Sequence, residues 1–90
     1  MIKGKTKSGF EYKVNENKLK DARLLRSFAR AQKNEDGFGN IEIMVQLIGE
    51  NQYDAICDHV EKNGIANIDD VMVEVQEILE AVAKNENSKN

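Results

Sequence analysis

The longest regular pattern in the chain is an apolar repeat that predicts a single helix over residues 68 to about 84. Asn67 is a suitable N-cap for this helix, and Asp69 and Asp70 in its first turn favour the positive end of the helix dipole. A helix of this length has a broad apolar face, so the rest of a 90-residue chain must cover that face or leave it to a partner. The apolar side chains recur at helical spacing: Ile68, Val71, Met72, Val75, Ile78, Leu79 and Val82.

The opposite side of this helix is acidic. Asp70, Glu74 and Glu77 recur there, with Glu80 beside them. Two carboxylates can serve as general acid and general base when their surroundings shift one pKa away from the other. Because no apolar residue surrounds this group in the pattern, we expect a solvated acidic face rather than a catalytic pair.

The segment before this helix predicts two shorter helices separated by one glycine. Residues 41–48 are apolar except for Glu42 and Gln46, which is too continuous for a surface helix and too short for a membrane span. We therefore expect a buried helix of two turns that ends at Gly49, where a positive φ is needed. The next helix, residues 51–63, has apolar side chains at helical spacing: Tyr53, Ile56, Cys57 and Val60.

Alternation of apolar and charged side chains predicts a β-hairpin over residues 2–14. Phe10, Tyr12 and Val14 alternate with charged residues, and Gly9 supplies a turn position that tolerates positive φ. A lone two-stranded hairpin is only marginally stable in water, so we expect its apolar face to lie on helices.

The pattern changes to a helical period over residues 19–33. We expect the apolar side of this helix to face the core; its members are Ala22, Leu25, Phe28 and Ala29, with Leu24 and Ala31 widening it. The opposite side carries four cations, named here the basic stripe: Arg23, Arg26, Arg30 and Lys33. Three residues near the start are suitable N-caps: Asn15, Asn17 and Asp21.

Together these patterns predict one mostly helical α+β domain over residues 1–83. The expected order is the N-terminal β-hairpin followed by four helices, at about 19–33, 41–48, 51–63 and 68–84. The composition of residues 34–40 predicts a connecting loop. Residues 84–90 contain no apolar side chain, so we expect a disordered C-terminal tail.

The chain offers few groups for catalysis or metal binding. Cys57 and His59 are two residues apart, which separates them by about 200° around a helix, and the chain has no second cysteine or histidine. With Ser8 in a turn and Ser27 in a helix, we see no nucleophile, base and orienting acid that could work together. We predict a protein without enzymatic activity, cofactor or bound metal.

Positive and negative charge are divided unevenly along the chain. Residues 1–33 carry ten Lys and Arg against three acidic residues, whereas residues 34–90 carry three Lys against thirteen acidic residues. This division indicates either a basic surface for nucleic acid or two halves that attract each other within or between chains. The acidic half would repel a polyanion within a Debye length of about 8–10 Å. We therefore expect attraction between the halves, including self-association, rather than nucleic-acid binding.

The sequence shows no features of a membrane or secreted protein. We find no stretch of 18 or more apolar residues and no charged-then-apolar leader, so we expect neither a membrane span nor a signal peptide. One cysteine cannot close an internal disulfide, in agreement with a reducing compartment. We expect a cytoplasmic protein.

The order of these elements resembles that of a known family. A basic hairpin ending in FEYKV, an amphipathic helix, a polar loop, an apolar helix continuing into LIGENQYDAI and a longer acidic helix are similar to the small tail assembly chaperones of long-tailed, non-contractile bacteriophages and prophages. The resemblance covers about residues 10–82. Its strongest part runs from Leu47 to Tyr53, where that family places an apolar pair, a glycine, an acidic or polar pair, a glutamine and an aromatic residue.

The resemblance implies a chaperone that binds the tape measure protein and keeps it soluble and extended until tail tube subunits polymerise around it. In that family a translational frameshift also yields a longer form, whose extension recruits the tail tube protein. The pairs Lys84-Asn85 and Lys89-Asn90 are each compatible with the slippery heptamer A-AAA-AAC.

The apolar helices provide a candidate surface for such a partner. Residues 41–60 and 68–82 offer more apolar surface than a small core needs, and a partner helix would use such a surface through anchors at i, i+3, i+4 and i+7. The alternative is that these helices bury all of it against residues 19–33 and the hairpin. The predicted partner-binding residues are Ile43, Met44, Leu47, Tyr53, Ile56, Val71, Val75, Ile78 and Leu79.

The basic stripe is predicted to be a second, charged interaction surface. Two further functions stay open on the sequence. One is a small DNA-binding regulator that uses the basic stripe, and the other is an interaction domain with an unidentified partner.

Overall fold

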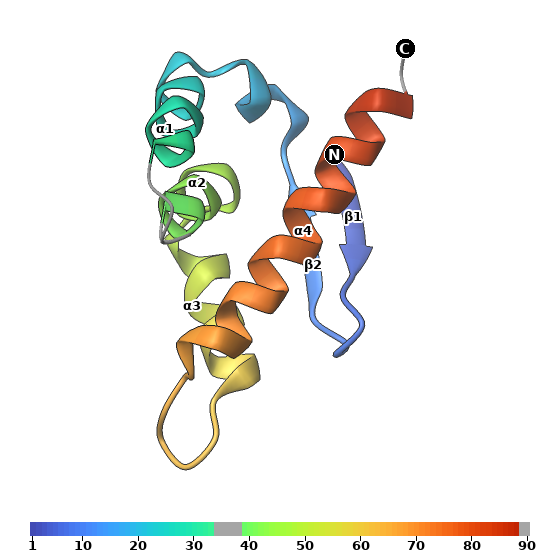
Figure 1. Ribbon diagram of the computed structural model, residues 1–90. Helices are drawn as coiled ribbons and strands as arrows, with labels where there is room; N and C mark the ends of the chain where they lie inside the picture. The colour runs from blue at the N-terminus through green and yellow to red at the C-terminus, as the bar shows by residue number, and fades with distance from the viewer. Residues whose placement is uncertain (34–38, 89–90) are drawn as a thin grey trace.

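The computed structural model describes residues 1–33 and 39–88 (Figure 1). Its elements are β1 (Ile2–Lys5), β2 (Glu11–Val14), the 3₁₀ helix η1 (Glu16–Lys20), α1 (Ala22–Gln32), α2 (Gly39–Ile48), α3 (Glu50–Val60) and α4 (Ile68–Ser88). Within these residues the predicted order of one antiparallel hairpin followed by four α-helices is confirmed. In Figure 1 the long helix α4 runs diagonally across the molecule, with α1, α2 and α3 along one side of it and the hairpin against the other.

The hairpin separates an apolar face from a charged face. Ile2 pairs with Val14 and Gly4 with Tyr12, so successive side chains alternate between the core and the solvent. Ile2, Tyr12 and Val14 are buried, whereas the intervening residues Lys3, Lys5, Glu11 and Lys13 are exposed. Gly4 allows the Tyr12 side chain to lie directly over it, because a Cβ there would lie 2.3 Å from the hydroxyl oxygen of Tyr12.

One hydrophobic core joins the hairpin to all four helices. The predicted buried helix is confirmed as α2, and Gly49 after it has the expected positive φ, at 88°. Burying this apolar surface is the main favourable contribution to folding, at about 25 cal/mol per Å². The buried apolar residues are Ile2, Phe10, Tyr12, Val14, Leu24, Ile43, Met44, Leu47, Ile56, Val71, Val75, Ile78 and Val82.

The helix α1 is rotated relative to the sequence prediction. Leu24 and Ser27 are buried at 2% and 3% exposure, whereas Leu25 and Phe28 are 61% and 37% exposed. Our prediction of the core-facing side was therefore wrong. The side expected to be buried is exposed along its length: Ala22, Leu25, Phe28 and Ala29.

The close approach of α1 to α2 explains this rotation. A Cβ added to Gly39, the first residue of α2, would lie 2.7 Å from the Cβ and 2.8 Å from the Cα of Ala31. Helices meet at so short a distance only through small side chains, because the side chains at the contact set the interaxial distance. Ser27 and Ala31 lie on one face, four residues apart, and are small enough for this contact. Phe28 is not.

The helix starts follow the side-chain caps. Asn15 Oδ1 accepts a hydrogen bond from the first turn of η1, Asp21 Oδ1 accepts one at the start of α1, and Asn67 Oδ1 accepts one at the start of α4. The predicted single helix over residues 19–33 is thus divided into η1 and α1.

The predicted tail and the predicted loop both extend into residues that the structure does not describe. The helix α4 continues to Ser88, past the expected end near residue 84, and residues 89–90 of the predicted tail lie outside the described residues. So do residues 34–38 of the predicted loop. Among residues 1–33 and 39–88, none of the helices combines the length and the hydropathy that a membrane span requires.

Candidate functional site

An apolar groove lies between η1, α1, α2 and α4. Its volume is about 290 Å³, and its lining residues are Leu19, Phe28, Leu47, Leu79, Val82 and Ala83. Leu47 and Val82 are buried at 2% and 4% exposure and form its floor. Leu19, Phe28 and Leu79 retain partial exposure at its sides. We call these six residues the apolar groove.

The exposed side of α1 continues the apolar groove onto the surface. Phe28 belongs to both, and Leu25, one helical turn before it, is among the most exposed large apolar side chains of the described residues. At about 100° per residue, α1 therefore has three faces: a core face at Leu24 and Ser27, an open apolar face at Leu25 and Phe28, and the basic stripe. Together the groove and the open face of α1 form an apolar surface that nothing in the described chain covers.

The basic stripe lies beside that surface. Arg23, Arg26, Arg30 and Lys33 are all exposed. Arg30 Nη1 lies 3.2 Å from Glu42 Oε1 of α2, in an ion pair that is half exposed on both sides and thus contributes little stability. Among the residues whose side chains are described, no ion pair joins the basic stripe to the acidic residues of α4.

Most of the predicted partner-binding residues form the core instead of the surface. Seven of the nine have 3% exposure or less, while Tyr53 and Leu79 are partly buried. The seven are Ile43, Met44, Leu47, Ile56, Val71, Val75 and Ile78. Of the nine, only Leu47 and Leu79 line the apolar groove. A partner could reach the six other buried residues only if the helices separated.

The open face of α1 was not predicted to be a binding surface, although the sequence indicates that this side of the helix is apolar. The open face of α1 was recognised as apolar and was assigned to the core, because periodicity identifies an apolar side but not what covers it.

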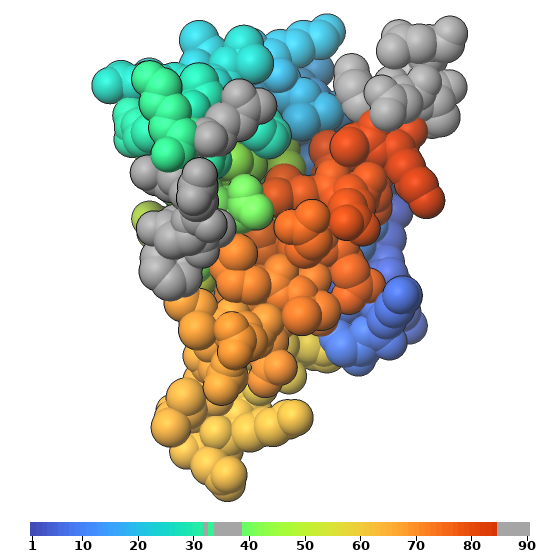
Figure 2. Space-filling model, viewed as in Figure 1, coloured from blue at the N-terminus to red at the C-terminus, as the bar shows by residue number. Residues whose placement is uncertain are grey.

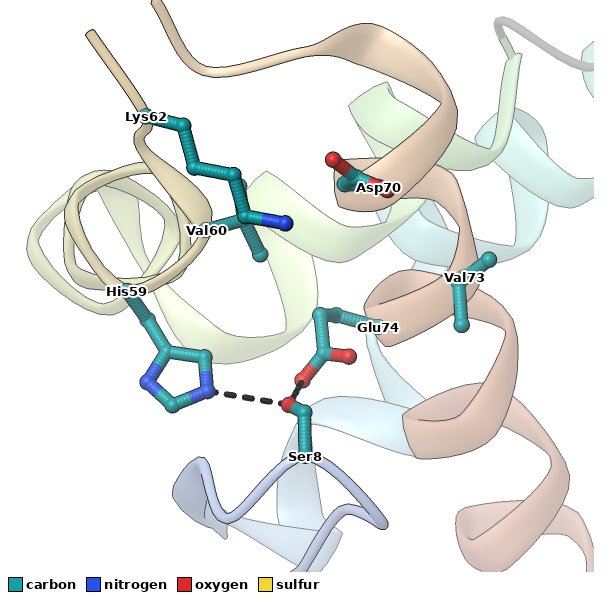
Figure 3. Close-up of a pocket in the computed structure, with 7 residues that line it drawn as sticks. All are labelled: Ser8, His59, Val60, Lys62, Asp70, Val73 and Glu74. Atoms are coloured by element: carbon teal, nitrogen blue, oxygen red, sulfur yellow. Dashed lines mark hydrogen bonds between the residues drawn. The ribbon is translucent and has the colours of Figure 1, made fainter. Parts of the chain in front are cut away.

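A buried carboxylate defines a second candidate site (Figure 3). Glu74, which we expected on a solvated face, is 3% exposed. Its Oε1 accepts hydrogen bonds from the hydroxyls of Thr6, at 2.6 Å, and of Ser8, at 2.9 Å. The expectation was wrong because the turn of the hairpin folds over this side of α4, and spacing along one helix does not reveal a distant segment.

His59 of α3 extends this network. Its Nε2 lies 2.9 Å from Ser8 Oγ. Because the Ser8 hydroxyl donates its proton to Glu74, the network assigns the proton on His59 to Nε2, which then donates to Ser8. The imidazole also packs on Phe10, with 5.5 Å between ring centroids. The network therefore fastens the hairpin turn to both α3 and α4.

The geometry of this network does not match that of a catalytic triad. In a triad the acid orients the histidine, and the histidine accepts the proton of the serine. Here Ser8 donates directly to Glu74, and His59 is the donor to Ser8. In the part of the chain that the structure describes, no group of three or more His, Cys, Asp or Glu side chains could hold a metal ion.

Cys57 is a partly buried free thiol. Burial raises the pKa of the Cys57 thiol, and nearby Asp54 and Asp58 raise it further against the opposing effect of a hydrogen bond with Tyr53. A raised pKa lowers the thiolate fraction, which is the reactive form. This environment therefore favours an inert side chain over a nucleophile.

Comparison of the chain with protein-family models, with curated proteins and with solved structures found no match.

Proposed function

We propose that this protein is a chaperone that binds an amphipathic helical segment of a partner protein, and that the partner is the tape measure protein of a bacteriophage tail. The observation that carries the proposal is the exposed apolar face of α1, which continues into the apolar groove at Phe28. The protein would act in the cytoplasm of the bacterial host.

The apolar lining of the groove and its continuation onto the open face of α1 suit the apolar side of a partner helix. The groove volume of about 290 Å³ lies at the lower end of small-molecule pockets, which begin near 300 Å³. A hollow of this size suits apolar side chains inserted from a partner helix, and the open face of α1 adds contacts at Leu25. The adjacent basic stripe favours a helix with acidic residues flanking its apolar side.

The resemblance supplies the identity of the partner. The resemblance implies a long, helical tape measure protein that is kept soluble and extended until the tail tube surrounds it. A groove that binds such faces individually would keep the chain soluble along its length. A longer frameshifted form would bring tail tube subunits to the same complex.

The coding DNA provides the first test. A slippery heptamer at Lys84-Asn85 or Lys89-Asn90, followed by an overlapping open frame and then a gene for a very long helical protein, would support the proposal. A stop codon in every frame and an unrelated neighbouring gene would contradict it.

Co-expression with that neighbouring protein tests the groove directly. The parent is expected to keep the long helical protein in the soluble fraction, whereas Leu25→Asp and Phe28→Asp are expected to lose this effect. Val73→Asp is the matched control, because Val73 is an apolar residue of α4 that is 56% exposed and lies outside the apolar groove. Equal solubility with all three variants would refute the role of the groove.

A second candidate function is nucleic-acid binding through the basic stripe. The observation in its favour is the exposure of Arg23, Arg26 and Lys33, which form no ion pair within the described residues. An electrophoretic shift of duplex DNA that depends on salt, and that Arg26→Glu with Arg30→Glu abolishes, would favour this function. If the parent protein produced no shift, nucleic-acid binding would be refuted as a function.

Self-association between the basic stripe of one copy and the acidic helix of another is a related proposal. Because such contacts are screened by salt, association is expected at low ionic strength. Light scattering that shows only monomer at high concentration and low salt would contradict it.

A further inference from the structure

The hairpin has two edges, and the structure closes one of them. Beyond β2, the side-chain amide of Gln52 makes two hydrogen bonds with the backbone of Lys13. Gln52 Oε1 accepts from the Lys13 N–H at 2.9 Å, and Gln52 Nε2 donates to the Lys13 carbonyl at 2.9 Å. These are the two bonds that a neighbouring strand would make. The helix α3 thus satisfies the edge of β2 with a single side chain.

The same contact identifies which backbone groups of β1 point outward. Since the Lys13 groups point away from β1, Lys13 and its partner Lys3 form a non-hydrogen-bonded pair. Pairs alternate along an antiparallel ladder, so Lys5 and Glu11 form the next pair of this kind. The N–H and C=O groups of Lys3 and Lys5 therefore point out from the open edge of β1. No hydrogen bond to these outward groups is present in the described part of the chain.

The two sides of this open edge differ in chemistry. On the outer face, Lys3 and Lys5 are exposed, and the nearest acidic partner, Glu11, lies 4.0 Å from Lys5 Nζ. On the inner side, a hollow of about 380 Å³ separates the edge from α4. Tyr12 and Ala81 contribute apolar surface to that hollow. Tyr12 extends over Gly4 in the edge strand, which lacks a side chain that would block it.

We propose that the open edge of β1 binds an extended acidic segment of a partner protein as a third strand of the sheet. Its acidic side chains would lie over Lys3 and Lys5 on the outer face. The alternating side chains would point towards the hollow, where apolar ones contact Tyr12 and Ala81. The charged residues that also line this hollow are of both signs: Lys5, Lys7, Glu77, Glu80 and Lys84.

A second copy of the chain is a poor occupant of this edge. Antiparallel pairing of β1 with β1 around Gly4 would place Lys3 of one copy opposite Lys5 of the other on the same face. Like charges directly opposite each other destabilise a strand pair, and edge lysines are a common means of preventing such pairing. The same lysines attract a strand of opposite charge, which is why the edge selects an acidic partner.

Amide hydrogen exchange with a model peptide tests the proposal. The probe is an acetylated heptapeptide of alternating glutamate and valine, and the control peptide has the same composition in two blocks. In the free protein the Lys3 and Lys5 amides are expected to exchange rapidly, while the Gly4 amide is protected by pairing with Tyr12. Added probe should protect Lys3 and Lys5 and leave Gly4 unchanged. Absence of saturable binding, binding without this protection, or equal binding of the control peptide would overturn the proposal.

Two variants test the contribution of the backbone. Lys5→Pro removes an outward N–H without removing a hydrogen bond of the hairpin, and Lys5→Ala removes the same charge but keeps the N–H. Lys5→Pro is expected to raise the Kd of the probe about fivefold relative to Lys5→Ala, the factor for one net hydrogen bond. Equal Kd values would contradict strand addition. If the amide spectrum shows that Lys5→Pro disrupts the hairpin, the double variant Lys3→Glu, Lys5→Glu replaces it. That variant is expected to lose probe binding, and retained binding would overturn the proposal.

Discussion

Replacing each of two adjacent leucines by alanine, in separate variants, tests the rotation of α1 on which the proposed binding surface depends. Leu24 is 2% exposed and belongs to the core, whereas Leu25 is 61% exposed on the open face. Truncating a buried leucine removes its transfer free energy and leaves a cavity, at a cost of about 2–5 kcal/mol. Leu24→Ala is therefore expected to lower the free energy of unfolding by about 3 kcal/mol. Leu25→Ala removes a side chain already in water, so we expect a change within about 0.5 kcal/mol.

The expected difference is large compared with the stability of a domain of this size. A free-energy change of 1 kcal/mol shifts the Tm of a 60–100-residue domain by about 4–8 °C, so Leu24→Ala should lower the Tm by about 12–24 °C. Helix propensity does not mask the effect, because alanine is at least as good a helix former as leucine at both positions.

Urea unfolding followed by far-ultraviolet circular dichroism measures both free energies. The two variants serve as controls for each other, since they make the same chemical change at neighbouring positions of one helix. Equal m values would show that both unfold from the same compact state. If Leu25→Ala cost as much as Leu24→Ala or more, the side predicted from the sequence would be the buried one, and the open apolar face of α1 would not exist.

Three further predictions concern the polar network, the helix contact and the free thiol. Thr6→Val should lower the free energy of unfolding by about 1–3 kcal/mol, because it removes a buried hydroxyl that donates to Glu74, and Thr6→Ser should retain most of the stability in the same urea experiment. Gly39→Ala should destabilise the fold by about 1–3 kcal/mol in thermal unfolding, because the new methyl group would lie 2.7 Å from the Cβ of Ala31. A gain in stability would show that the higher helix propensity of alanine outweighs the packing clash. Cys57 should react with iodoacetamide more slowly in the native than in the urea-unfolded protein near neutral pH. Because burial raises the pKa of the Cys57 thiol above that of an unfolded cysteine, its contribution to stability should be complete below the unfolded-state pKa and be lost as the pH rises through the folded-state pKa. Unfolding experiments across this pH range that show no loss of stability would contradict the shift.

The elements themselves could be predicted from local patterns. Alternation over residues 10–14 indicated a strand, and the apolar repeat over residues 68–82 indicated a long helix, because both periods are fixed by backbone geometry. Gly49 marked the boundary between α2 and α3, since it alone in that segment adopts positive φ without steric cost. The Asn67 cap followed from its position before the repeat and is present in the structure.

The candidate sites could not be predicted in the same way. Glu74 looks like its acidic neighbours in the sequence and is buried because Thr6 and Ser8, more than sixty residues earlier, supply hydrogen bonds to its carboxylate. Gln52 carries no local sign that its amide closes the edge of a strand. Both roles depend on partners that are distant in the chain.

By itself the sequence determined the order of the hairpin and the four α-helices and which of their sides are apolar, because these follow from the backbone period and the local caps. The tertiary structure alone decided which apolar side is covered. On α1 the close contact of Ala31 with Gly39 selects the small residues for the core and leaves Leu25 and Phe28 exposed. Which side of α1 is buried depends on packing between elements, that is, on how the shapes of two surfaces fit together. The apolar period of one helix contains no information about the shape of the surface that packs against it.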